Sequence, residues 1–103
     1  MSDPMRIRAV VQGSDAVVRV LMSHEMESGQ RKDAAGAIIP AWYITDMSAA
    51  LNGKLVLSAQ WGTAIAKNPF TQFTIKGAKS GDKISITWTD NRGDKRTDDA
   101  VVA

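Results

Sequence analysis

Alternating apolar and polar positions predict β-strands along most of this chain. Every second residue of Met5–Val11 is apolar, and Arg6 and Arg8 lie between them. The same period of two is clearest in Ile84–Thr89, where isoleucine and tryptophan alternate with serine and threonine. Such alternation is typical of strands that bury one face and expose the other.

Similar patterns, separated by turn residues, predict about seven strands in all, at 5–11, 16–23, 42–51, 54–61, 73–76, 84–89 and 95–102. Asn52-Gly53 between two of them predicts a tight hairpin, because both residues tolerate positive φ. In 54–61 the alternation places Leu55, Leu57, Ala59 and Trp61 on one face. Residues 63–67 are expected to form at most one helical turn before Asn68-Pro69.

Seven short strands with frequent turns and almost no helix predict an all-β fold. We expect an immunoglobulin-like antiparallel β-sandwich, and a small barrel is the alternative. At 103 residues the chain is expected to be a single domain, 1–103. Trp88 is expected to lie in the core, because it falls on the apolar face of its strand.

A polar segment, Ser23–Pro40, interrupts this strand pattern. Gly29 and Gly36 can adopt positive φ at little cost, so we expect two turns in it. We interpret the segment as a ribbon that leaves the sheet and returns near Trp42. It would either present side chains to a partner or serve as a purely structural staple.

Composition narrows the range of functions. Thirteen basic and eleven acidic residues give a net charge of +2 with interspersed signs, which argues against a nucleic-acid groove. The chain has no cysteine, so disulfides and thiolate metal sites are excluded. We see neither a signal peptide nor an apolar run of membrane-spanning length, and these facts alone would predict a cytoplasmic protein.

No residue set in the chain makes a convincing catalytic or metal site. His24 with Glu25 and Glu27 is the best candidate, but a transition metal requires three or four ligands and the chain has no second histidine. The serines lack the sequence context of an activated nucleophile. We therefore predict a non-enzyme without cofactor or metal, and protein binding becomes the leading class of function. Trp42, near the end of the polar segment, is a candidate anchor for a partner.

The polar segment also carries a family resemblance. It resembles the hallmark of the SoxZ family of the bacterial sulfur-oxidation (Sox) system, with the pattern His24-x-Met26-Glu27-Ser28-Gly29-Gln30-Arg31-x-Asp33-x-x-Gly36-x-x-Ile39-Pro40. Further matches follow in the order of the family, at Asn52-Gly53, Ala66-x-Asn68-Pro69-Phe70 and Thr87-Trp88-Thr89-Asp90-x-x-Gly93. The resemblance covers almost the whole chain.

The resemblance implies a partner and a location that composition does not. SoxZ proteins pair with SoxY, which carries the sulfur intermediate on a cysteine of a C-terminal arm, and they provide scaffold and docking surface for the other Sox enzymes. SoxY carries the export signal, so the resemblance implies a periplasmic heterodimer without a signal peptide on this chain. The residues expected to contact partners are His24, Met26, Glu27, Arg31, Asp33 and Trp42.

Two alternatives stay open. Ala41 and Met47 stand where the family commonly has a basic residue and a phenylalanine, and this departure allows a related carrier linked to a quinoprotein dehydrogenase. The strand pattern by itself also allows a stand-alone immunoglobulin-like binding module.

Overall fold

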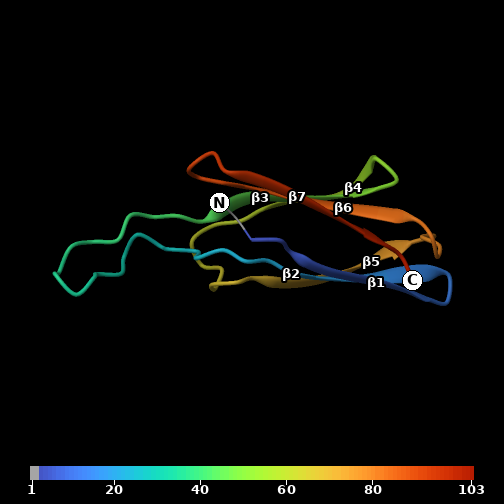
Figure 1. Cartoon of the computed structure of the whole chain (residues 1–103), viewed down its shortest axis with the longest axis horizontal. Coiled ribbons are helices and arrows are strands. Elements are labelled where there is room, and N and C mark those ends of the chain that lie inside the picture. The colour runs from blue at the N-terminus through green and yellow to red at the C-terminus, as the bar shows by residue number, and fades with distance from the viewer. Residues whose placement is uncertain (1–2) are drawn as a thin grey trace.

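The computed structural model describes residues 3–103 and is all-β (Figure 1). This part of the chain contains seven strands and no helix: β1 Arg6–Gln12, β2 Asp15–Leu21, β3 Ile44–Leu51, β4 Lys54–Gln60, β5 Phe70–Lys76, β6 Lys83–Asp90 and β7 Lys95–Val101. All pairings are antiparallel. The first sheet has the strand order β1-β2-β5 and the second β4-β3-β6-β7. The predicted immunoglobulin-like sandwich is therefore confirmed.

The core lies between the two sheets and is built from the apolar faces of the alternating strands. Val18 and Val20 from the first sheet are fully buried, as are Ile84 and Ile86 from the second. Trp88 is 1% exposed, which confirms its predicted core position. Ala103, after β7 of the second sheet, pairs with β1 of the first. The N–H of Val11 donates to the carbonyl of Ala103, and the N–H of Ala103 donates to the carbonyl of Ala9.

One predicted face is wrong. Leu55 is 62% exposed, although the alternation placed it beside Leu57, Ala59 and Trp61. The register between β3 and β4 shifts at this point, because Ala49 pairs with Leu57 while Ala50 pairs with Leu55, leaving Val56 as an extra residue. Such a bulge turns the residue beyond it to the opposite face. Residues 63–67 form irregular turns and not the single helical turn that their sequence allowed.

The hairpin prediction is confirmed at Asn52-Gly53, whose φ angles are 50° and 85°. The polar segment is also a ribbon, as expected. It leaves the sandwich after β2, returns into β3 and projects beyond the body of the molecule along its long axis (Figure 1). The molecule measures 53 × 21 × 21 Å. Isolated bridges join Glu27 to Trp42 and Lys32 to Ile38, so the ribbon is two-stranded but only loosely paired.

Candidate functional site

The base of the ribbon is organised around the carboxylate of Asp90, the last residue of β6. Its Oδ2 accepts hydrogen bonds from His24 Nε2 at 3.1 Å and from Trp42 Nε1 at 2.7 Å. Its Oδ1 accepts from the backbone N–H groups of Arg92 and Asp94, at 3.0 and 2.9 Å. Asp90 is only 3% exposed. One carboxylate therefore links the outgoing strand of the ribbon, the returning strand and the β6–β7 turn.

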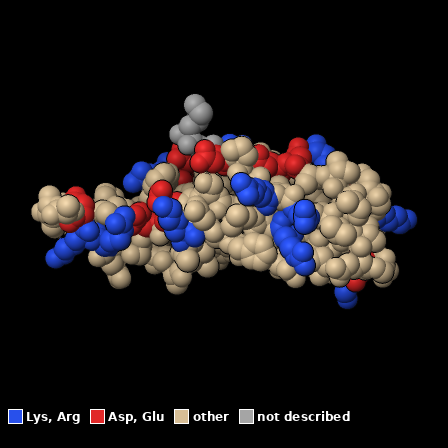
Figure 2. Space-filling view, turned by 60° about the horizontal axis from the view of Figure 1, so that its bottom comes forward, with Lys and Arg blue, Asp and Glu red and all other residues tan. Residues whose placement is uncertain are grey.

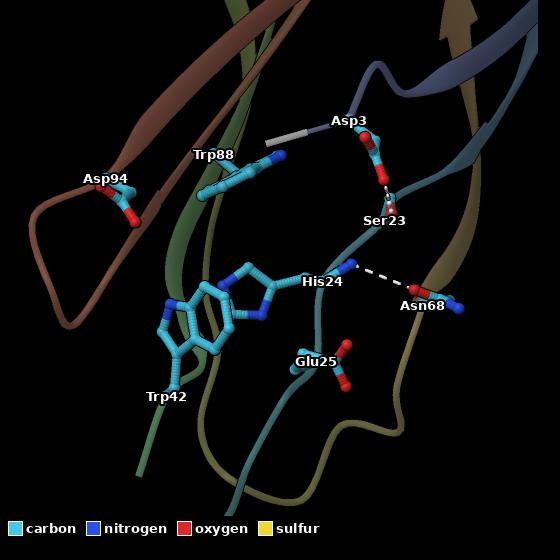
Figure 3. Close-up of a pocket in the computed structure, with 8 residues that line it drawn as sticks. All are labelled: Asp3, Ser23, His24, Glu25, Trp42, Asn68, Trp88 and Asp94. Atoms are coloured by element: carbon cyan, nitrogen blue, oxygen red, sulfur yellow. Dashed lines mark hydrogen bonds between the residues drawn. The ribbon is translucent and has the colours of Figure 1, made fainter. Parts of the chain in front are cut away.

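Both ring nitrogens of His24 are used inside the fold. The N–H of Met26 donates to His24 Nδ1 at 3.1 Å, so Nε2 carries the ring proton and donates it to Asp90. The imidazole lies between two indole rings, with centroid distances of 4.9 Å to Trp42 and 5.1 Å to Trp88 (Figure 3). The edge-on geometry toward Trp88 is a favourable arrangement of aromatic rings.

Two asparagines complete the clamp on the ribbon. Asn68 Oδ1 accepts the N–H of His24 at 3.1 Å, and the N–H of Asn68 donates to the carbonyl of His24 at 2.9 Å. On the other side, Asn91 Oδ1 accepts the N–H of Tyr43 and its Nδ2 donates to the carbonyl of Ala41. The guanidinium of Arg92 lies 4.4 Å from the ring centroid of Trp42, which is cation–π distance. Both strands of the ribbon are therefore held where they leave the sandwich.

A cavity of about 160 Å³ lies beside this cluster, and Figure 3 shows its lining residues: Asp3, Ser23, His24, Glu25, Trp42, Asn68, Trp88 and Asp94. Among the described buried side chains, the indole nitrogen of Trp88 has no hydrogen-bond partner. No group of three or more histidine, cysteine or acidic side chains within residues 3–103 is arranged to hold a metal ion. The cavity is thus lined by aromatic rings and polar groups. Among these residues, the hydroxyl of Ser23 donates to Asp3 and the N–H of His24 donates to Asn68.

Beyond its base, the ribbon is exposed and is held by local contacts. The guanidinium of Arg31 donates to both carboxylate oxygens of Glu27, which lies four residues earlier in the sequence. At the tip, Asp33 Oδ1 accepts the N–H groups of Ala35 and Ala37 at 2.9 and 3.0 Å. Gly36 adopts φ +84°, which confirms the turn expected there. The Arg31 side of this ion pair is exposed, and pairs open to solvent add little stability, so the contact mainly fixes the shape of the ribbon.

Gly29 marks the second expected turn and also has φ +84°. A Cβ atom at this position would lie 3.1 Å from the Cβ of Ala41 on the returning strand. The two strands of the ribbon therefore approach each other closely here, and only glycine satisfies both the backbone angle and the spacing.

Comparison with protein families identifies the chain. The model of the family described as sulphur oxidation protein SoxZ matches residues 5–101. The chain belongs to the SoxZ family. Its role accordingly lies in the Sox sulfur-oxidation system. Comparison with curated protein sequences finds no match.

The fold separates the six predicted partner residues of this SoxZ chain into two groups. His24 and Met26 are buried, at 6% exposure each, and Trp42 is half-buried against His24. Glu27 is half-buried on the ribbon, and Arg31 and Asp33 are exposed on it. The first group forms the base of the ribbon and the second its surface. That these residues contact a partner stays a prediction.

Sequence reasoning missed the residue that joins the site together. Asp90 falls within the quoted family motif, but its local pattern indicates only a turn after a strand. Asn68 and Arg92 were also missed as parts of the clamp. Met26 was recognised, but not its positive φ of 51° or the 3.4 Å contact in which its sulfur accepts the N–H of Ile44. The only available signal was the presence of Asp90 and Asn68 in the family motifs.

The hydrogen bonds to Asp90 determine its charge. Burial raises the pKa of this carboxyl, but the hydrogen bonds from His24, Trp42 and the backbone of Asp94 and Arg92 together outweigh burial. The net effect is a pKa below the ordinary value of 3.8. Asp90 is therefore ionised at neutral pH and accepts hydrogen bonds through both oxygens.

The lowered pKa predicts how stability depends on pH. A carboxyl with a lower pKa in the folded state stabilises the fold above its unfolded pKa, and this contribution is lost as pH falls through the folded pKa. We expect the free energy of unfolding to decrease from about pH 4 downward, with up to about 1.4 kcal/mol per pH unit due to Asp90. Urea unfolding from neutral to acidic pH measures this. The Asp90→Asn variant should show a shallower acid dependence, and an identical slope would contradict the assignment.

Proposed function

We propose that this chain is the non-catalytic subunit of a SoxYZ-type sulfur carrier. It pairs with a SoxY-like subunit that holds the sulfur intermediate on a C-terminal cysteine, and it docks the Sox enzymes that act on that intermediate in thiosulfate oxidation. The pair works in the periplasm, exported through the signal of the partner. The observation that carries this proposal is the ribbon itself, a projecting exposed element fixed to the sandwich by a buried polar cluster.

The ribbon has the properties of a binding element rather than of a catalytic one. A two-stranded ribbon alone is only marginally stable in water, so it gains stability when a partner covers it. Ile38, on the returning strand of the ribbon, is 62% exposed. Apart from two isolated bridges, the backbone of the ribbon is not paired in a sheet. Unpaired strand edges of this kind are suited to pairing with another chain.

The buried cluster at the base supports the ribbon and occupies both ring nitrogens of His24. Nδ1 of His24 is occupied by the N–H of Met26, and Nε2 by the carboxylate of Asp90. A general base needs a lone pair directed at the substrate. The arrangement therefore favours a structural role for the only histidine.

Substitution of His24 by glutamine tests the non-catalytic role. The amide nitrogen of glutamine can still donate to Asp90, while the ring contacts and the acceptor for Met26 are lost. Loss of a general acid or base would reduce turnover about 100- to 10,000-fold. We expect the sulfur-oxidation rate of the reconstituted system, per mole of folded carrier complex, to stay within about twofold. A rate loss of the catalytic size at unchanged complex concentration would refute the proposal.

A further inference from the structure

The outer face of the β1-β2-β5 sheet carries two adjacent rows of side chains that the ribbon does not involve. Cross-strand pairing places Arg6 opposite Leu21 and Leu21 opposite Phe70 in one row. The next row holds Arg8, Arg19 and Gln72. Leu21 is the last residue of β2, so these rows lie at the end of the sheet from which the ribbon departs.

The charges in these rows are arranged unfavourably for an isolated protein. Arg8 and Arg19 are direct cross-strand partners, and like charges at such positions destabilise a sheet. None of the three arginines forms an ion pair with a carboxylate of the described residues; Arg19 Nε donates instead to Gln72 Oε1 at 3.1 Å. Figure 2 shows basic groups in the middle of the molecule on this side and acidic groups along its upper edge.

Apolar side chains lie directly beside these arginines. Phe70 is 61% exposed and Leu21 is 39% exposed. Together with the arginines they line a shallow hollow of about 380 Å³, whose lining residues are Arg6, Ile7, Arg8, Arg19, Leu21 and Phe70. A clustered aromatic, leucine and arginine composition is typical of the central residues of protein interfaces.

We propose that this face binds an acidic segment of a protein partner, with carboxylates on the arginines and an apolar side chain between Leu21 and Phe70. Charge complementarity specifies the occupant, because bound carboxylates would relieve the repulsion between Arg8 and Arg19. The surface is separate from the ribbon, so a carrier subunit could hold one partner through the ribbon and a second through this face. The proposal does not depend on the function assigned to the ribbon.

A defined peptide tests the proposal. The probe is a short synthetic peptide with glutamates on either side of a central phenylalanine, and its control has glutamines in place of the glutamates. We expect amide NMR shifts confined to β1, β2 and β5, and binding at least about tenfold weaker in the Arg8→Glu/Arg19→Glu double variant. The matched control, Lys54→Glu/Lys95→Glu, makes the same charge change on the other sheet and should bind normally.

Three results would overturn the proposal. Absence of shifts on this face is one, and equal binding by both double variants is another. Equal or stronger shifts with a DNA oligonucleotide or with anionic phospholipid vesicles would show a general anion-binding surface instead. Shortening of the ribbon should leave peptide binding unchanged, which separates this test from that of the proposed carrier function.

A stability measurement supplies an independent check. The single substitution Arg8→Glu places opposite charges across the strands and should raise the Tm of the isolated chain at low salt. The gain should shrink at high salt, because screening weakens interactions between exposed charges. A lower Tm would show that the paired arginines stabilise the fold, and would remove the argument that they are retained for binding.

Discussion

Substitution of Asp90 by alanine is expected to destabilise the chain by about 3 kcal/mol. The change removes both carboxylate oxygens, so four donors lose their acceptor: His24 Nε2, Trp42 Nε1 and the N–H groups of Arg92 and Asp94. Each buried donor left unsatisfied costs about 1–3 kcal/mol, and water can reach those near the turn. The net loss is therefore smaller than the sum.

Urea unfolding followed by tryptophan fluorescence measures this effect. Trp42 donates to Asp90, and Trp88 packs against the imidazole of His24. The fluorescence of both tryptophans is therefore sensitive to the structure of the cluster. The matched control is Asp94→Ala, which removes an exposed carboxylate from the same turn and should change stability by less than about 0.5 kcal/mol. Equal losses in the two variants would show that Asp90 does not organise the base of the ribbon.

The sandwich could be predicted because its strands obey a local rule. Alternation with a period of two depends only on neighbouring residues, and β6 shows it without exception from Ile84 to Thr89. The rule fails where a non-local event shifts the register, as at the bulge that turns Leu55 outward. The sequence around Leu55 does not indicate the bulge, because the bulge depends on how β4 pairs with Ala49 and Ala50 of β3.

The cluster at the base of the ribbon could not be predicted either, because it joins residues that are far apart in the sequence. His24 and Asp90 lie 66 residues apart in sequence, and Trp42 lies 48 from Asp90. Only the folded sandwich brings the end of β6 beside the exit of β2. The ribbon itself could be predicted, since its polarity and its two glycines are local features. The prediction that its side chains meet a partner awaits experiment.

Shortening of the ribbon is expected to abolish the complex with a SoxY-like chain while leaving the sandwich folded. Residues 30–38 are exposed, so replacing residues 30–39 by a short glycine turn removes little of the core. The Tm of the isolated chain should therefore fall by only a few degrees. Circular dichroism measures the Tm, and size-exclusion chromatography of the co-expressed chains measures the complex. Wild-type association by the shortened chain would show that the ribbon is only a structural staple.

A single substitution refines this prediction. Ile38 on the ribbon and Leu55 on the sandwich are equally exposed, at 62%. Ile38→Asp should weaken partner binding at least about tenfold, since a charge would replace an apolar contact at the interface. Leu55→Asp makes the same chemical change away from the ribbon and should leave the affinity unaltered. Equal affinities for the two variants would place the contact elsewhere on the chain.

We propose that this chain binds a SoxY-like partner as a subunit of a sulfur carrier. Co-expression with the SoxY-like chain of the same source, followed by native mass spectrometry of the purified material, tests it most directly. We expect a stable 1:1 heterodimer under reducing conditions, where an intermolecular disulfide cannot form. Two separate chains under both reducing and oxidising conditions would contradict it.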